Sequence, residues 1–103
     1  MNRNLVIRLE VSLRDMLKFG RKFERMKVDD AGVFIRKIPK YKDEPAYIAI
    51  EINPIGTDGL PINKMGIIIR NKQELDAIRE ILSRTVVDEC LQDVEKVMQG
   101  DLV

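Results

Sequence analysis

Apolar and polar residues alternate most regularly in the middle of the chain. From Ala46 to Asn53, one set of alternate positions holds Ala46 and three isoleucines, while the other holds Tyr47, Ala49, Glu51 and Asn53. Alternation with a period of two is typical of a β-strand that has one buried side. The pattern predicts a strand here, with the isoleucines facing the core and Tyr47 on the exposed face.

Two neighbouring segments predict strands that pair with this one. Val33–Ile38 is rich in β-branched residues, follows the turn-forming Asp29–Gly32 and stops before Pro39. Residues 54–61 contain two glycines and two prolines, which predicts a long hairpin loop, and Met65–Arg70 supplies the returning strand. We therefore expect an antiparallel meander of three strands, or of four if a further segment joins it.

The N-terminal part of the chain predicts a helix with two distinct sides. Residues 4–10 place leucine and isoleucine at every second position, which predicts a short strand, or alternatively an extended arm, ahead of the helix. The helix is predicted from Ser12, which with Asp15 approximates a capping box. Its apolar side holds Leu13, Met16, Leu17, Phe23 and Met26. Its cationic side holds Arg14, Lys18, Arg21, Lys22 and Arg25.

The C-terminal part predicts one long helix. Asn71 and Glu74 form a second start that resembles a capping box, and no glycine or proline follows before Met98. Toward its end, apolar residues recur at intervals of four, three and four, the spacing of a helix-pairing seam. The seam consists of Val87, Leu91, Val94 and Met98. We expect this seam to join copies into a dimer or tetramer. Alternatively, the second half packs back on its own sheet, or the helix bends near Thr85.

Together these elements predict an α+β fold. An N-terminal strand or arm and a basic amphipathic helix precede an antiparallel meander of three to four strands, and a long C-terminal helix serves oligomerisation. A chain of 103 residues is close to the commonest domain size. We therefore expect a single domain over residues 1–103, with 86–103 as a helical oligomerisation extension.

Charge is distributed unevenly along the sequence. Residues 1–42 carry 12 Lys and Arg against 5 Asp and Glu, a net charge of +7, whereas residues 43–103 carry 6 against 12, a net charge of −6. The overall charge of +1 conceals this difference. Unless folding intermixes the two parts, the asymmetry predicts a surface that attracts polyanions.

The residue types present exclude most catalytic and metal-binding chemistry. The chain has no histidine and one cysteine, so zinc sites and histidine-activated nucleophiles are excluded. Carboxylates such as Asp29, Asp30, Asp43 and Glu44 leave a magnesium-dependent nuclease as an alternative, although solvated turns account for them. The chain also lacks a glycine-rich phosphate-binding loop. We expect no enzymatic activity, no cofactor, no metal and no small-molecule substrate.

The sequence also bears on location. No apolar run approaches the ~20 residues of a membrane span, and the first residues do not resemble a signal peptide, so we expect no membrane partner. Cys90 alone cannot form an internal disulfide, which favours the reducing cytoplasm. Because Cys90 lies at helical spacing among apolar neighbours, we expect its side chain to be buried.

Cations and aromatic rings are most concentrated between residues 34 and 47. The segment holds Phe34, Arg36, Lys37, Lys40, Tyr41, Lys42 and Tyr47. Single-stranded nucleic acids are bound by cations along the phosphates and by rings on which bases stack. We therefore expect the cations of this segment to bind phosphates. The rings expected to stack on bases are Tyr41, Tyr47 and Phe34. The positive field should be extended by cations of the first helix, Arg21, Lys22 and Arg25. Alternatively, Phe34 and Tyr47 belong to the core and residues 40–42 form an ordinary loop.

The layout of these segments resembles known modules that bind single-stranded DNA. The layout is a run of strand segments from Gly32–Lys37 through to Lys64–Ile69, followed by a long helix. This layout is similar to that of the archaeal ThermoDBP-related group, and more loosely to that of the transcriptional coactivator positive cofactor four. The resemblance covers roughly residues 12–98. It implies a sequence-tolerant binder of single-stranded DNA or RNA that forms a homo-oligomer. The alternative from the residues is a protein assembly module that uses the long helix and binds no nucleic acid.

Overall fold

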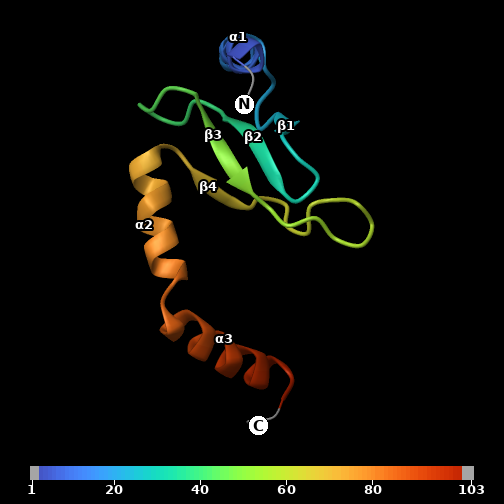
Figure 1. Cartoon of the computed structure of the whole chain (residues 1–103), viewed down its shortest axis with the longest axis vertical. Coiled ribbons are helices and arrows are strands. Elements are labelled where there is room, and N and C mark those ends of the chain that lie inside the picture. The colour runs from blue at the N-terminus through green and yellow to red at the C-terminus, as the bar shows by residue number, and fades with distance from the viewer. Residues whose placement is uncertain (1–2, 101–103) are drawn as a thin grey trace. The chain divides into compact units, whose positions relative to one another are not determined.

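A computed structural model describes the backbone of residues 3–100 and the side chains of residues 10–100. The chain divides into two compact units, residues 1–70 and residues 71–103. The boundary at residue 71 lies well before residue 86, where we expected the helical extension to begin. The first unit holds the sheet and the first helix, and the second holds two helices (Figure 1).

The first unit contains a four-stranded antiparallel sheet with strand order β1-β2-β3-β4. Its strands are β1 (Arg25–Lys27), β2 (Val33–Ile38), β3 (Tyr47–Ile52) and β4 (Ile67–Ile69). The meander and the α+β class predicted from the sequence are therefore confirmed. Strand β2 has the predicted bounds, β4 is shorter than predicted, and β1 adds a short fourth strand at one edge.

The N-terminal strand or arm predicted over residues 4–10 is wrong. Those residues belong to helix α1 (Arg3–Phe19). Leucine and isoleucine at every second position over so few residues do not exclude a helix. The chain contains no glycine or proline from Arg3 to Phe19 that would end one. The helix stops at Gly20, so Phe23 and Met26 do not belong to its apolar side as predicted. Phe23 instead lies in the connection to β1, and Met26 lies within β1.

The turn predicted before β2 is confirmed and depends on one carboxylate. An Asp29 Oδ1 atom accepts hydrogen bonds from the backbone N–H groups of Ala31, Gly32 and Val33, at 3.0 to 3.1 Å. The bond from Val33, together with the other two, holds the pKa of Asp29 below its usual value. Gly32 has a φ of 130°, a conformation that residues with a side chain rarely adopt.

The strand register separates the sheet into two faces. We call one the helix face; its residues include Met26, Ile35, Lys37, Ile48, Ile50 and Ile69. We call the other the network face; its residues include Arg25, Phe34, Arg36, Ala49 and Glu51. Helix α1 lies on one side of the sheet (Figure 1), and Lys37 Nζ donates a 2.9 Å hydrogen bond to the carbonyl of Gly20 at its end. The helix therefore covers the helix face.

The prediction that only the isoleucine side of β3 is buried is wrong. Ile48, Ile50 and Ile52 are half-buried, whereas Glu51 is 0% exposed and Ala49 is also buried. Period-two patterns place a polar residue on the solvent side by default, but a charged residue can be buried when the fold supplies its partners. Two arginines supply them here, as described below.

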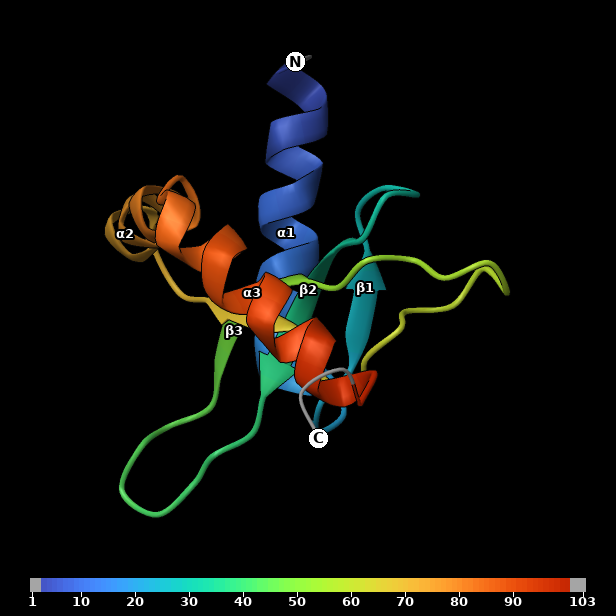
Figure 2. The same cartoon turned by 90° about the horizontal axis from the view of Figure 1, so that it is seen from below.

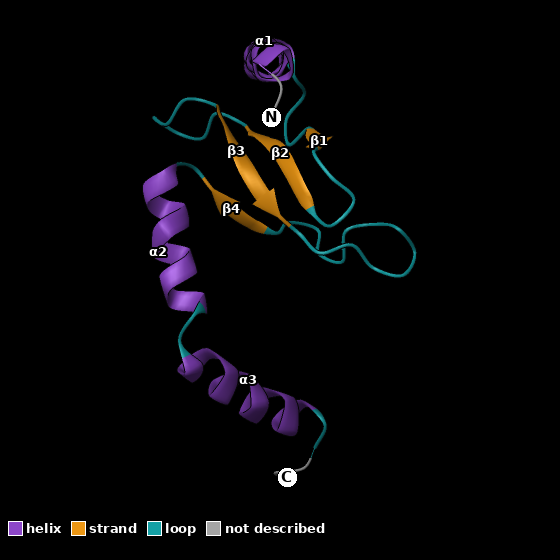
Figure 3. Cartoon of the chain, in the orientation of Figure 1, coloured by secondary structure: helices purple, strands orange, loops and turns teal. Residues whose placement is uncertain are grey.

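The second unit contains two helices in place of the predicted single one. Helices α2 (Lys72–Leu82) and α3 (Thr85–Met98) are separated at Ser83 and Arg84 (Figure 3). The start is as predicted, because Asn71 Oδ1 accepts a 2.8 Å hydrogen bond from the backbone N–H of Glu74. At the break, Ser83 Oγ donates to the Glu80 carbonyl, and Arg84 has extended backbone angles. The structure therefore has the alternative we considered, an interruption near Thr85.

None of the helices among the described residues is both long and apolar enough to cross a membrane.

Candidate nucleic-acid interface

The network face is organised around the Glu51 carboxylate. Arg25 contacts both of its oxygens, through Nε at 2.8 Å and through Nη2 at 3.0 Å, and Arg36 Nη1 binds Oε2 at 3.1 Å. The same Oε2 accepts hydrogen bonds from Asn53 Nδ2 at 3.2 Å and from the Gly66 backbone N–H at 2.7 Å. The network therefore fixes β1, β2 and the loop before β4 to one buried atom of β3.

These contacts determine the charge state of Glu51. Burial raises the pKa of its carboxyl, but the hydrogen bonds from Arg25, Gly66 and Asn53 and the charge of Arg25 outweigh burial and lower the pKa to about 2. The ordinary value is 4.5. The carboxylate is thus ionised in the folded protein at every pH at which the network is intact.

Acid should therefore weaken the protein. Because the folded-state pKa of Glu51 lies below its ordinary value, its stabilising contribution is complete above pH about 4.5 and is lost as the pH falls toward about 2. We expect the free energy of unfolding, measured by urea denaturation, to fall over this range. The difference between the wild type and Glu51→Gln should shrink over the same range, and a difference that is independent of pH would contradict this assignment.

Several residues predicted to bind nucleic acid serve the fold instead. Phe34 is 5% exposed and lies beneath Arg25, whose Cζ is 5.1 Å from the ring centre. Arg36 is buried on the same face, whereas Lys37 points to the helix face. Arg25 lies in β1 and binds Glu51 rather than extending a helix surface. The prediction that Arg36 and Phe34 are exposed beside Tyr47 is therefore wrong, and the alternative, that Phe34 belongs to the core, is what the structure has.

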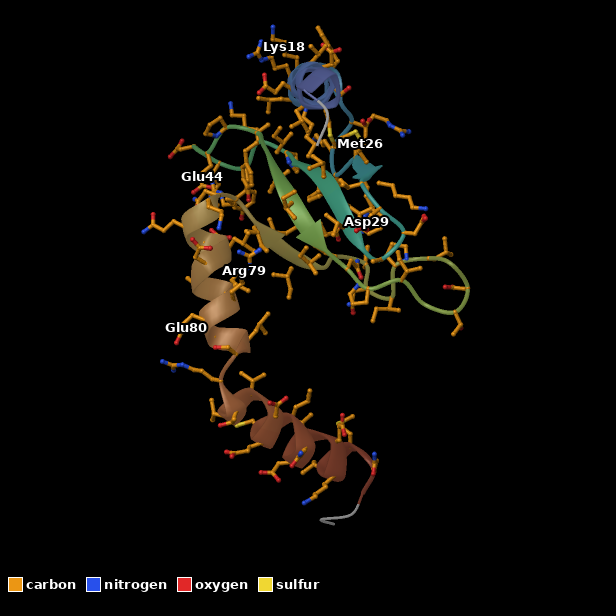
Figure 4. The ribbon with its side chains drawn as sticks, in the orientation of Figure 1. Lys18, Met26, Asp29, Glu44, Arg79 and Glu80 are labelled. Atoms are coloured by element: carbon orange, nitrogen blue, oxygen red, sulfur yellow. The ribbon has the colours of Figure 1, made fainter. Side chains whose placement is uncertain are left out.

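A second set of the predicted residues does come together, around a groove at the end of the β2–β3 hairpin. We call it the hairpin groove. It is lined by Lys22, Phe23, Ile38, Pro39, Lys40, Tyr41, Glu44, Pro45 and Tyr47 and has a volume of about 450 Å³. Figure 2 shows this hairpin projecting beyond the end of the sheet, and Figure 4 marks Glu44 on it.

Three aromatic rings lie along the hairpin groove. Tyr41 is 67% exposed and Phe23 is 44% exposed, while Tyr47 is half-buried. Each ring has a cation nearby: Lys42 Nζ is 5.3 Å from the centre of the Tyr41 ring, Arg36 Cζ is 5.8 Å from that of Phe23, and Arg70 Cζ is 4.1 Å from that of Tyr47. Exposed rings beside cations are the chemistry with which single strands are bound.

Backbone geometry holds two of the groove elements in place. Tyr41 and Glu44 exchange two backbone hydrogen bonds of 3.0 Å, and Lys42 between them has a φ of 52°. Phe23 has a φ of 61°, which is uncommon for a bulky residue, and its carbonyl accepts a 3.0 Å hydrogen bond from Arg36 Nε. Unusual backbone conformations of this kind occur frequently at functional sites. Phe23 was missed as a site residue because its spacing fits the apolar side of the preceding helix.

Charge around the hairpin groove is positive. Lys22 and Lys40 line it against the single lining carboxylate of Glu44, and in the hairpin turn the charge of Lys42, next to Tyr41, is offset by that of Asp43. Arg21 is exposed outside the groove and lies 3.6 Å from Glu24. Residues 1–70 as a whole carry 14 Lys and Arg against 9 Asp and Glu, a net charge of +5. The sheet unit therefore has a net positive charge, and the positive field expected from the sequence stays a prediction.

Helix α3 leaves its predicted seam uncovered. None of its residues is buried; Val87 is half-buried, and Leu91, Val94 and Met98 are exposed. Cys90 is also exposed, so the expectation that it is a buried core residue is wrong. The spacing correctly identified an apolar side, and none of its residues is buried by the described part of the chain.

No metal site is formed among residues 3–100 by any group of three or more Cys, His, Asp or Glu side chains. Comparisons with protein-family models, curated proteins and solved structures found no match. The resemblance to the ThermoDBP-related group and to positive cofactor four therefore stays a prediction.

Proposed function

We propose that this chain binds single-stranded nucleic acid in the hairpin groove, without sequence preference and without catalysing a reaction. The observation that carries the proposal is the presence of three aromatic side chains, Phe23, Tyr41 and Tyr47, beside Lys22 and Lys40 along one groove. Each base stacked on a ring contributes about 1 to 3 kcal/mol. Duplex DNA keeps its bases inside the helix, so rings of this kind favour a single strand.

The proposal differs from the one drawn from the sequence in the residues that take part. Tyr41, Tyr47, Lys40, Lys42 and Lys22 keep their proposed roles. Phe23 replaces Phe34 as a stacking ring, and Arg36 acts behind the groove by binding the Phe23 carbonyl. We place the protein in the reducing cytoplasm, where the exposed Cys90 stays a thiol.

Salt provides the test. If Lys22, Lys40 and Lys42 each contact a phosphate, the logarithm of the association constant should fall with the logarithm of salt concentration with a slope of about −2. Fluorescence anisotropy with a labelled oligothymidylate, its RNA counterpart and a duplex of equal length gives this slope for each ligand. We expect tighter binding to the single strands than to the duplex. Unchanged anisotropy with micromolar protein at low salt would remove the proposal.

A second candidate function is protein assembly through α3, which is supported by the uncovered apolar side of that helix. In this case the lysines of the hairpin groove are a solvated surface. Light scattering and anisotropy together distinguish the two candidates, because an assembly module forms oligomers but leaves the anisotropy of a labelled oligonucleotide unchanged. A monomer that binds oligonucleotide would exclude assembly as the main function.

A further inference from the structure

Helix α3 is amphipathic, with an apolar side that needs a partner. At about 100° per residue, its apolar residues fall within an arc of about 140°. These residues are Val86, Val87, Cys90, Leu91, Val94, Val97 and Met98. Short helices in proteins obtain most of their stability by burying such a side, but no residue of α3 is buried. A surface that covers this arc should therefore stabilise the helix.

The charges at the borders of the arc restrict what this partner can be. On the same helical projection, Asp93 borders one side of the arc and Asp88 and Glu95 border the other. The helix carries four acidic residues against Lys96 alone. A second α3 packed on this arc, parallel or antiparallel, would bring acidic border against acidic border, and like charges in such positions repel. The borders therefore favour a partner surface that is apolar in the centre and cationic at its rim.

The hairpin groove has this chemistry. Its walls contain Phe23, Pro39 and Tyr41, and the two lysines Lys22 and Lys40 outnumber the one lining carboxylate, Glu44. The unit that carries the groove has a net charge of +5, against −3 for residues 85–98. We propose that α3 of a second copy of this chain docks in the hairpin groove, with its acidic borders against these lysines. The inference rests on the proposed function because it assigns the same groove a second anionic ligand.

Area favours a reciprocal arrangement. Burying about 100 Å² for each of the six aliphatic and methionine side chains of the arc, Cys90 left aside, removes roughly 600 Å² from one helix. One such contact, counted on both partners, lies near the lower limit of about 1,000 Å² for a specific interface, whereas two clear it. Two copies that exchange their α3 helices around a two-fold axis form both contacts at once. The expected product is a closed dimer in which each groove is occupied by a helix.

The sign of the salt dependence distinguishes this dimer from paired α3 helices. Sedimentation equilibrium of the full chain without nucleic acid, at 50 and 500 mM NaCl, should show a dimer that weakens as salt rises, because opposite charges meet. A dimer that strengthens with salt would show that like-charged α3 helices pair, and would overturn the proposal. So would a monomer at all concentrations.

The surface itself is tested with charge-matched variants. Lys40→Glu places a carboxylate in the groove and should raise the dimer dissociation constant about tenfold or more. Lys18→Glu makes the same change of charge on an exposed position of α1, away from the groove, and should have a much smaller effect. Equal effects of the two variants would show that net charge alone matters and would overturn the assignment of the groove.

Cys90 reports on the helix directly, because it is the single cysteine and lies within the apolar arc. Its reaction with N-ethylmaleimide should slow as protein concentration rises, and Leu91→Asp should restore fast reaction at all concentrations. Leu91→Asp leaves the core intact because Leu91 is exposed, which circular dichroism checks. Fast reaction of the wild type at concentrations where it is dimeric would overturn the docking of α3.

Adding oligothymidylate separates the failure of this inference from that of the proposed function. If both ligands use the groove, the oligonucleotide should lower the dimer fraction of the full chain. If the chain binds no oligonucleotide but forms a dimer that Lys40→Glu weakens, the docking is supported and the proposed function is removed. Oligonucleotide binding that leaves the dimer fraction unchanged overturns the docking and leaves the function intact.

Discussion

Glu51→Gln is expected to lower the free energy of unfolding by about 3 kcal/mol, because it removes the charge that two partly buried arginines face. Oε2 accepts four hydrogen bonds, from Arg25, Arg36, Asn53 and the Gly66 backbone. Glutamine has almost the same shape, but its amide nitrogen would point at donors and its oxygen accepts fewer of them. Urea denaturation at pH 7 measures the loss.

A matched control distinguishes this buried network from ordinary surface ion pairs. Glu24→Gln removes a carboxylate that pairs with the exposed Arg21, and such pairs contribute less than about 1 kcal/mol. We expect the free energy of unfolding of this variant to lie within about 0.5 kcal/mol of the wild-type value. If Glu51→Gln were as stable as Glu24→Gln, the network would not hold the sheet together as described.

Tyr41→Ala is expected to weaken binding of a single strand by about 1 to 3 kcal/mol, which corresponds to a rise of the dissociation constant of roughly 5- to 150-fold. The side chain is exposed, so its removal should leave the free energy of unfolding nearly unchanged. Tyr41→Phe keeps the ring and should bind almost as the wild type does. Fluorescence anisotropy at fixed salt measures the dissociation constants of the wild type and of the two Tyr41 variants.

The chain offers a second exposed ring as the control for this prediction. Phe19, at the end of α1, is 80% exposed and does not line the hairpin groove. Phe19→Ala therefore removes a comparable apolar surface at another place and should leave binding unchanged. Equal losses in Phe19→Ala and Tyr41→Ala would place the strand elsewhere on the sheet unit.

Signals that act within a few residues allowed much of the fold to be predicted from the sequence. The Asp29 turn and the Asn71 cap depend on contacts between near neighbours, while strand β2 and the loop after β3 are marked by the residue types of their own segments. The fourth strand could not be predicted in this way. Residues 25–27 form a strand only because β2 supplies their hydrogen-bond partners, and three residues carry too little pattern of their own.

The faces of β3 show why the candidate site was predicted only in part. Glu51 is 26 residues from Arg25 and 15 from Arg36 along the chain, so its sequence neighbours do not reveal that it is buried. Phe34 and Arg36 lie on the same face of the sheet as Glu51, so they are buried with it. Tyr41 and Lys40 were identified because a hairpin end is exposed whichever face of the sheet is covered.

Arg36 connects the interior of the sheet to the hairpin groove. One end of its guanidinium binds Glu51, and its Nε holds the carbonyl of Phe23. Because Phe23 has a backbone conformation that is unfavourable for its side chain, this bond maintains a shape that the local sequence would not keep alone. The wall of the groove is thus secured from inside the protein. A change of the lysines at the rim would alter the charge of the groove and leave its shape, whereas a change of the central carboxylate would deform the surface that ligands meet.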